Sequence, residues 1–215
     1  MPSPHPLLAL FTAAADGRFP PSDGTVTVLP PTAGGLECSV AFTGHAVVAT
    51  ALPEAEVRAW EPDAFGGSMA ADFLHRLAGP GGWTGCVDAV LVARGTGGPP
   101  RLPEVITPEA VGHPRVRYAR RIRSGVTVHG DERGLITLAD GLAGRRELSI
   151  ELHASSPTGK GVGRTLVEDA LSLVPEGEPL FAAVSPGNAR SLRAFLACGF
   201  VPLGSEVLVR PSRSR

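Results

Sequence analysis

The chain has 215 residues, 43% of them apolar and 19% charged, so it can bury a sizeable core as one large domain or two small ones. A net charge of -1 and an isoelectric point near 6.6 exclude a general electrostatic attraction to nucleic acid or to an anionic membrane. Three widely separated cysteines, Cys38, Cys86 and Cys198, match no metal-ligand spacing. They indicate reduced thiols in a cytoplasmic protein rather than a disulfide framework.

Residues 1–85 predict an N-terminal α/β extension, rich in short strands and without a functional motif. The apolar run Leu7 to Ala15 is too short to span a bilayer and lacks the basic start of a signal peptide, so we expect a short docking helix. Short strands are expected at Thr25 to Leu29, Leu36 to Phe42 and His45 to Leu52. This part is too apolar to be disordered, and we expect it to pack on the rest of the chain.

The middle of the chain opens a second domain, which we expect over residues 86–210, with 211–215 as a flexible tail. Val87 to Ala93 predicts a buried strand, and a Gly- and Pro-rich loop follows from Arg94 to Pro103. Pro114 suits the first turn of a helix that runs to about Arg123 and carries five arginines. These could bind a phosphorylated partner or nucleic acid, but a run of this kind is more often a solvated helix face.

From Val126 onward the pattern predicts three antiparallel strands, followed by alternating helices and strands. The strands are expected at Val126 to His129, Gly134 to Ala139 and Glu147 to His153. The third alternates, with Leu148, Ile150 and Leu152 on one side and Glu147, Ser149, Glu151 and His153 on the other. This order predicts a mixed α/β sheet flanked by helices.

A glycine-rich loop joins the third of these strands to a helix. It reads Thr158-Gly159-Lys160-Gly161-Val162-Gly163-Arg164 and contains the only lysine of the chain. Glycines allow the backbone to approach a ligand closely, and the amides at a helix N-terminus favour an anion. The loop is neither a P-loop, because Lys160 precedes Gly161 rather than Ser or Thr, nor a dinucleotide fingerprint. A glycine-rich turn without a ligand is the remaining alternative for the loop taken alone.

A second block follows the strand Leu180 to Val184. Asn188 suits the N-cap of a helix, and Gly199 suits the left-handed residue that ends it. Together the two blocks resemble the GNAT acyltransferase superfamily, whose acyl-CoA loop has small residues where this chain has Gly161 and Gly163. The later helix of that family has an N-x-x-[S/A] start and a G-F end, matched here by Asn188, Ser191, Gly199 and Phe200.

The resemblance implies a GNAT fold with acetyl-CoA, or another short acyl-CoA, as cofactor. The implied cofactor-binding residues are the end of one strand, the glycine-rich loop and the later helix: Glu151, Leu152, His153, Thr158, Gly159, Lys160, Gly161, Val162, Gly163, Arg164, Asn188 and Ser191. In this family the fourth and fifth core strands, here Glu147 to His153 and Leu180 to Val184, splay apart to admit the pantetheine arm. Backbone amides near Glu151 to His153 would hold that arm.

The resemblance also implies attack by a neutral amine, which needs a base. Glu147 and Glu151 are the candidates, His153 could act through a water, and all three could equally be polar residues on a solvated face. Two positions depart from the family pattern. Thr158 replaces the usual Gln or Arg, and Phe195 replaces a tyrosine that protonates the leaving thiolate.

These observations favour an N-acetyltransferase that moves an acetyl or short acyl group to a primary amine. The alternative is a non-catalytic acyl-CoA-binding protein of the same fold, which the two departures favour. The acceptor is a small-molecule or peptide amine of unknown identity, with no nucleic acid or membrane partner and no metal expected. A homodimer would agree with the family, and residues 1–85 would help to shape the acceptor pocket.

Overall fold

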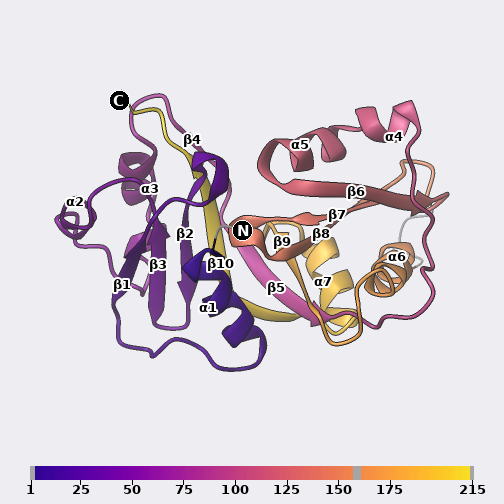
Figure 1. The fold of residues 1–215 in the computed structure, drawn as a ribbon, viewed down its shortest axis with the longest axis horizontal. Helices are drawn as coiled ribbons and strands as arrows, with labels where there is room; N and C mark the ends of the chain where they lie inside the picture. Colours follow the sequence, from indigo (N-terminus) through magenta and orange to yellow (C-terminus); the bar gives the residue numbers. More distant parts are fainter. Residues whose placement is uncertain (1–2, 157–160, 214–215) are drawn as a thin grey trace. The chain divides into compact units, whose positions relative to one another are not determined.

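The computed structural model describes residues 3–156 and 161–213, which form two compact units. One unit comprises residues up to Val90 together with residues from Leu203 onward, and the other comprises Leu91 to Pro202. Both combine helices with strands, so the expected mixed α/β class is confirmed (Figure 1).

The first unit is built on a sheet in the order β1-β3-β2-β10. These strands are β1 (Val26–Leu29), β3 (His45–Ala49), β2 (Glu37–Phe42) and β10 (Val201–Arg210). β1 pairs parallel with β3, whereas β2 is antiparallel to both β3 and β10. The short strand β4 (Trp83–Thr84) adds to β10. The predicted strands of this region are therefore present, at slightly different bounds.

Helices cover both faces of this sheet. α2 (Glu54–Arg58) and α3 (Ala71–Ala78) close a core that includes Val26, Ala46, Val57 and Phe73. On the other face, Phe11 of α1 (Pro6–Ala15) packs against Phe42 at 5.8 Å between ring centroids. The expected N-terminal docking helix is thus confirmed. Two 3-10 turns, η1 (Ala33–Gly35) and η2 (Gly67–Met69), complete the unit.

The second unit has the strand order β5-β9-β8-β7-β6. Its strands are β5 (Asp88–Arg94, from Leu91), β6 (Ser124–Asp131), β7 (Gly134–Asp140), β8 (Arg146–Leu152) and β9 (Pro179–Val184). The last three of this order, β8, β7 and β6, form the predicted antiparallel meander. A 3-10 turn, η3 (Leu142–Gly144), joins β7 to β8.

Two pairs of helices flank this second sheet on opposite faces (Figure 1). α4 (Pro108–Gly112) and α5 (Pro114–Ile122) lie on one face, where Val116 packs with Val128 and Leu135. α6 (Val162–Leu171) and α7 (Ala189–Ala197) lie on the other. Residues of β8 therefore point alternately toward α5 and toward α6.

The division of the chain differs from the expected domain of residues 86–210. Residues Ser205 to Val209 of β10 pair with Ala41 to Glu37 of β2, so this part belongs with the N-terminal unit. Residues 211–213, expected to belong to a flexible tail, contact β2 through Arg213. Arg213 forms two bonds of 2.8 and 2.7 Å with the buried Glu37, which fixes the segment.

Candidate functional site

The N-terminus of α6 keeps its expected position after β8. Gly161 is the N-cap, with φ +77°, and an added Cβ there would meet no atom of the described residues within 4 Å. A left-handed residue that faces open space suits glycine and leaves the first helical amides accessible. Thr158, Gly159 and Lys160, predicted to bind the cofactor, lie outside the described residues. Arg164 is exposed and forms an ion pair with Glu168 at 2.8 Å.

The two edges of β8 differ in their pairing. Toward β7 the ladder is continuous, from Gly134 opposite Leu152 to Asp140 opposite Arg146. Toward β9 the strands are parallel, and among their described residues the registered pair is Glu147 opposite Phe181 alone. β8 and β9 therefore separate beyond Glu147, which is the geometry that the resemblance implied for these two strands.

Ladder geometry decides which amides of β8 face this opening. The His153 N–H donates to the carbonyl of Arg133, in the loop before β7, at 3.1 Å. Backbone N–H groups alternate in direction along a strand. The N–H of Glu151 therefore also points toward β7, whereas the N–H groups of Ile150 and Leu152 point toward β9. The His153 amide is thus used by the sheet, whereas the Ile150 amide, which the sequence analysis did not name, faces β9.

An apolar side chain lies between this opening and α6. Leu152 is 38% exposed at the end of β8, and its Cδ1 would lie 3.7 Å from a Cβ at Gly163. The residue is therefore positioned by the start of α6 and still presents apolar surface to solvent.

Glu147, one of the two candidate bases, is buried, with 3% of its surface exposed. Its Oε1 accepts bonds from Arg123 at 3.3 Å and Arg145 at 3.2 Å, and its Oε2 accepts the Leu142 N–H at 2.9 Å. Burial raises the pKa of Glu147, but the charges of the two arginines and the Leu142 amide outweigh it, so the pKa lies below its ordinary value. A buried carboxylate held ionised by two guanidinium groups is a structural centre and a poor proton acceptor.

Glu151, the second candidate base, lies on the same face of β8 and is half exposed. Arg115, at the start of α5, donates to its Oε2 through Nε at 3.1 Å and Nη2 at 2.8 Å. His153 is exposed, and its Nε2 lies 3.2 Å from the carbonyl oxygen of Asp131. Of the two glutamates, Glu151 is the one that combines exposure with a position beside the strand opening, because Glu147 is buried.

The later helix uses its predicted residues mainly for its own structure. The Asn188 side chain accepts the backbone N–H of Ser191 at 3.1 Å, so it is the N-cap of α7. Phe195 is buried and packs edge-to-face on Phe200 at 4.9 Å, which explains an apolar ring where the family has tyrosine. Burial, followed by the nearby charge of Glu168, raises the pKa of the Cys198 thiol, as expected for a packing residue.

The arginine run on α5 is only partly a solvated face. Arg115 and Arg123, at its two ends, hold Glu151 and Glu147, whereas Arg117 and Arg120 between them are exposed. The sequence analysis missed these pairings and the part of Arg145, which stacks 5.3 Å from the Phe181 ring centroid. The sequence contained a usable signal for these ion pairs. The helix α5 has arginines at both ends, and the strand β8, two strands later in the chain, has two glutamates on one face.

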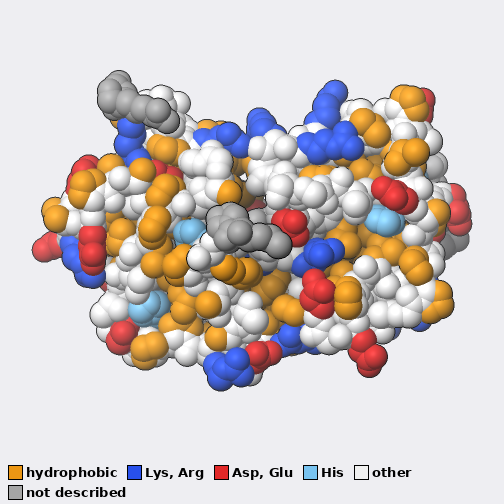
Figure 2. Space-filling model, viewed as in Figure 1, with side chains coloured by type: hydrophobic (Ala, Val, Ile, Leu, Met, Phe, Trp, Pro, Cys, Tyr) orange, Lys and Arg blue, Asp and Glu red, His pale blue; other side chains and the backbone are white. Residues whose placement is uncertain are grey.

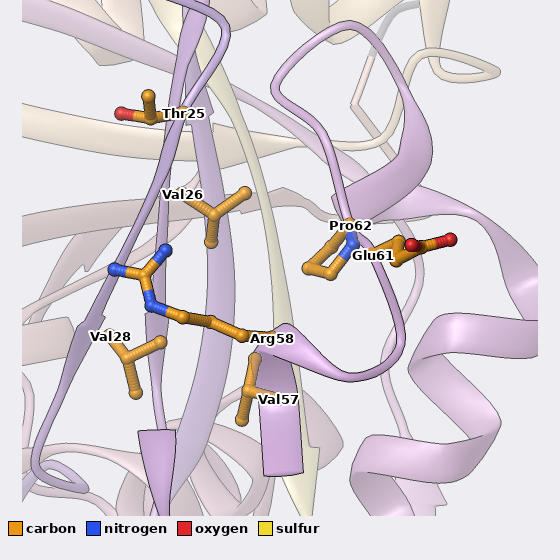
Figure 3. A pocket seen from close by; sticks show the side chains of 7 residues that line it. All are labelled: Thr25, Val26, Val28, Val57, Arg58, Glu61 and Pro62. Carbon is orange, nitrogen blue, oxygen red and sulfur yellow. The ribbon is translucent and has the colours of Figure 1, made fainter. Parts of the chain in front are cut away.

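A separate pocket lies in the N-terminal unit, with a volume of about 190 Å³. It is lined by Thr25, Val26, Val28, Val57, Arg58, Glu61 and Pro62 (Figure 3). Arg58 extends from α2 toward β1 and forms an ion pair with Glu54 at 2.5 Å. The pocket contains none of the predicted site residues, so the candidate site remains at β8, β9 and α6.

Two further features bear on what the site can hold. Among the described residues, no group of His, Cys, Asp and Glu is arranged to hold a metal ion. Within the same residues, no helix is long and apolar enough to cross a bilayer.

Comparison with known proteins gives similarity of fold only. No family model matches the chain, and no curated protein does. Among solved structures, one assigned to the GNAT family of acetyltransferases from Novosphingobium aromaticivorans has a TM-score of 0.42 and 14% identity, over 62% of this chain and 69% of that chain. A conserved protein of unknown function from Staphylococcus epidermidis has a TM-score of 0.42 and 10% identity, over 67% of this chain and 68% of that one. These likenesses carry no functional argument, so function must be argued from the site.

Proposed function

We propose that this chain is a GNAT-type N-acyltransferase, which transfers a short acyl group from acyl-CoA to a primary amine. The observation that carries the proposal is the separation of two parallel strands, β8 and β9, beside the glycine-led N-terminus of α6. An opening between parallel strands exposes backbone amides that a sheet would otherwise use. The motifs that resemble the GNAT superfamily lie on the same elements.

The described residues fit an acyl-CoA. Gly161 leaves room at the helix N-terminus, where backbone N–H groups and the helix dipole favour a pyrophosphate. The Ile150 and Leu152 amides face the opening and suit the amide-rich pantetheine arm, and the exposed Leu152 side chain suits its apolar parts. Acyl-CoA, when bound, supplies the activated acyl group as a thioester.

The residues of the chain would then perform two tasks in the reaction. An amide aimed at the acyl oxygen lowers the barrier by about 3 kcal/mol when the oxygen gains negative charge, and Leu152 is our candidate for this amide. Glu151 would take the proton of the acceptor ammonium, directly or through a water. Both Arg115 bonds end on Oε2, so we assign the proton to Oε1.

A second candidate function is acyl-CoA binding without transfer. The buried Phe195 provides no proton for a leaving thiolate, and Glu147 is committed to two arginines. Both functions require the same cofactor site, so they differ only in whether an amine is acylated. Thiol release in the presence of amines distinguishes them.

The first experiment is calorimetric titration of the protein with acetyl-CoA, CoA, NAD and ATP. We expect binding of the two CoA compounds alone. Gly161→Glu should weaken their affinity by at least ~100-fold, because it places a carboxylate at the anion site and a Cβ in a left-handed residue.

Gly177→Glu is the matched control for backbone strain and charge. Gly177 is also exposed, has φ +79° and would have no atom within 4 Å of a Cβ, but it precedes β9 at the other end of the strand. We expect this variant to bind CoA as the parent chain does. Absence of CoA binding in the parent chain would overturn the proposal.

A further inference from the structure

The turn between β6 and β7 lies against the end of β8. It consists of Glu132 and Arg133, because Asp131 and Gly134 form the last registered pair of the two strands. A Cβ added to Gly134 would lie 2.3 Å from the carbonyl oxygen of Glu151 in β8. Glycine permits this close approach of two backbones, so the turn is packed tightly on the end of β8.

The backbone carbonyl of Arg133 adds two hydrogen bonds to this packing. It accepts the His153 N–H at 3.1 Å and the Ser156 hydroxyl at 2.6 Å. Ser156 is 8% exposed, and its N–H donates to the carbonyl of His153 at 2.9 Å. The chain that leaves β8 is therefore held to the turn as far as Ser156.

The guanidinium of Arg133 connects the same turn to α6. Its Nη2 donates to Asp169 of α6 at 2.7 Å and to Asp131 at 2.6 Å. Its Nε lies 3.1 and 3.0 Å from the two carboxylate oxygens of Asp131, which orients the group from within the hairpin. On the face shown in Figure 2, basic side chains gather along the edge where α5 lies. The side chain of Arg133, by contrast, is only 22% exposed and is bonded to two carboxylates.

This connection adds a fixed direction to the packing of α6. Leu166, Val167 and Ala170 are buried and hold the helix on the sheet, but hydrophobic contacts are non-directional. Charge-assisted bonds from a guanidinium are strong and have a defined geometry. The bond from Arg133 to Asp169 therefore determines where α6 lies relative to the end of β8.

The position of α6 matters because an acyl-CoA would bind at two points. In the proposed function its pyrophosphate lies at Gly161, the N-cap of α6, and its thioester lies at the Leu152 amide, at the end of β8. One molecule reaches both points well only when they are correctly spaced. A misplacement of about 1 Å at a reacting group can cost ~100-fold in rate.

We infer that Arg133 is a positioning residue of the proposed cofactor site. Through Asp169 it fixes α6 so that a CoA held by its pyrophosphate brings its thioester to the Leu152 amide. This inference rests on the proposed function and adds to the same site a residue that acts through α6.

The test compares acetyl-CoA with 3′-phospho-ADP, the nucleotide half of CoA, by calorimetric titration of the full chain. Asp169→Ala removes the connection, keeps the pair between Asp131 and Arg133, and introduces a better helix former, so we expect it to fold. It should weaken acetyl-CoA affinity by ~10-fold and that of 3′-phospho-ADP by less than ~2-fold, because the anion site belongs to α6 itself. The readout requires no turnover.

Two further variants sharpen this comparison. R133A/D169A should bind acetyl-CoA as weakly as Arg133→Ala alone, because both changes remove the same connection. Arg146→Ala is the matched control, since Arg146 is also a partly exposed arginine with two carboxylate neighbours, Asp140 at 3.8 Å and Glu178 at 3.7 Å. It lies at the other end of β8 and should change neither affinity.

The outcomes separate the inference from the proposed function. Absence of acetyl-CoA binding in the parent chain overturns the proposed function, and the inference with it. If the parent chain binds acetyl-CoA, unchanged affinity in Asp169→Ala overturns the inference alone. Equal losses for acetyl-CoA and 3′-phospho-ADP overturn it as well, because they would show a general structural role for the ion pair.

Discussion

Glu37 in the first compact unit and Glu147 in the second are both buried, with similar surroundings and different positions. Glu37 accepts bonds from Arg213, Thr50 and the Ala51 amide, and Glu147 accepts bonds from Arg123, Arg145 and the Leu142 amide. The first ties residues 211–213 to β2. The second ties the end of α5 to β8, at the point where β8 and β9 separate. A buried carboxylate that is paired with arginine therefore indicates a structural ion pair between two chain segments, even beside a candidate active site.

The largest expected effect on stability comes from removing the negative charge of Glu147 or of Glu37. Glu147→Gln and Glu37→Gln should each lower the free energy of unfolding by ~3–5 kcal/mol, because each leaves buried guanidinium charge without its counter-charge. Urea unfolding at neutral pH measures both. A loss below about 1 kcal/mol for Glu147→Gln would contradict the structural role and return Glu147 to the list of candidate bases.

A smaller, graded effect is expected on acidification. The pKa of Glu147 is lowered in the folded chain, so its ion pairs stabilise the fold fully above the unfolded value of about 4.3. This contribution is lost as pH falls through the lower, folded value. Between pH 5 and pH 3 the unfolding free energy of the parent chain should therefore fall more steeply than that of Glu147→Gln. Equal slopes would show that Glu147 does not titrate differently in the two states.

The smallest effect on stability is expected for Glu151→Gln. Its ion pair with Arg115 is about 40% exposed on each side chain, so the loss should stay below ~1 kcal/mol. If Glu151 is the base, the same variant lowers kcat by ~100-fold and leaves acetyl-CoA affinity unchanged. Unchanged kcat would move the proton transfer to another group or to solvent.

The strands and helices were largely predictable, and the contacts between them were not. Alternation in β8, the proline in the first turn of α5 and the Asn188 cap of α7 are local signals, and each appears where expected. The distance between Arg115 and Arg123 along α5 matches the distance between Glu151 and Glu147 along β8. Eight residues of helix rise ~12 Å, and four residues of strand extend ~13 Å. That match becomes visible only once α5 is known to lie on β6 and β7, from where its end arginines reach the glutamates of β8.

The strand opening and the N-terminal pairing depend on distant residues. No local pattern in Glu147 to Leu152 indicates that its parallel neighbour departs after one registered pair. Likewise, β10 reads as an ordinary closing strand, and nothing in its sequence specifies β2 as a partner. The exposure of Glu151 and the burial of Glu147 also follow from the position of α5, since both alternate identically in sequence.

The pairing of β10 with β2 affects how the chain is made. During synthesis the first 90 residues leave the ribosome long before residues 203–213, which supply the strand beside β2 and the arginine for Glu37. Residues 91–202 contain a complete meander with its flanking helices, so they can fold before residues 203–213 are made. Until then the first 90 residues have an unpaired sheet edge at β2. A fragment cut after residue 90 would expose that edge permanently and is expected to aggregate. Expression trials should therefore retain both termini of this sequence.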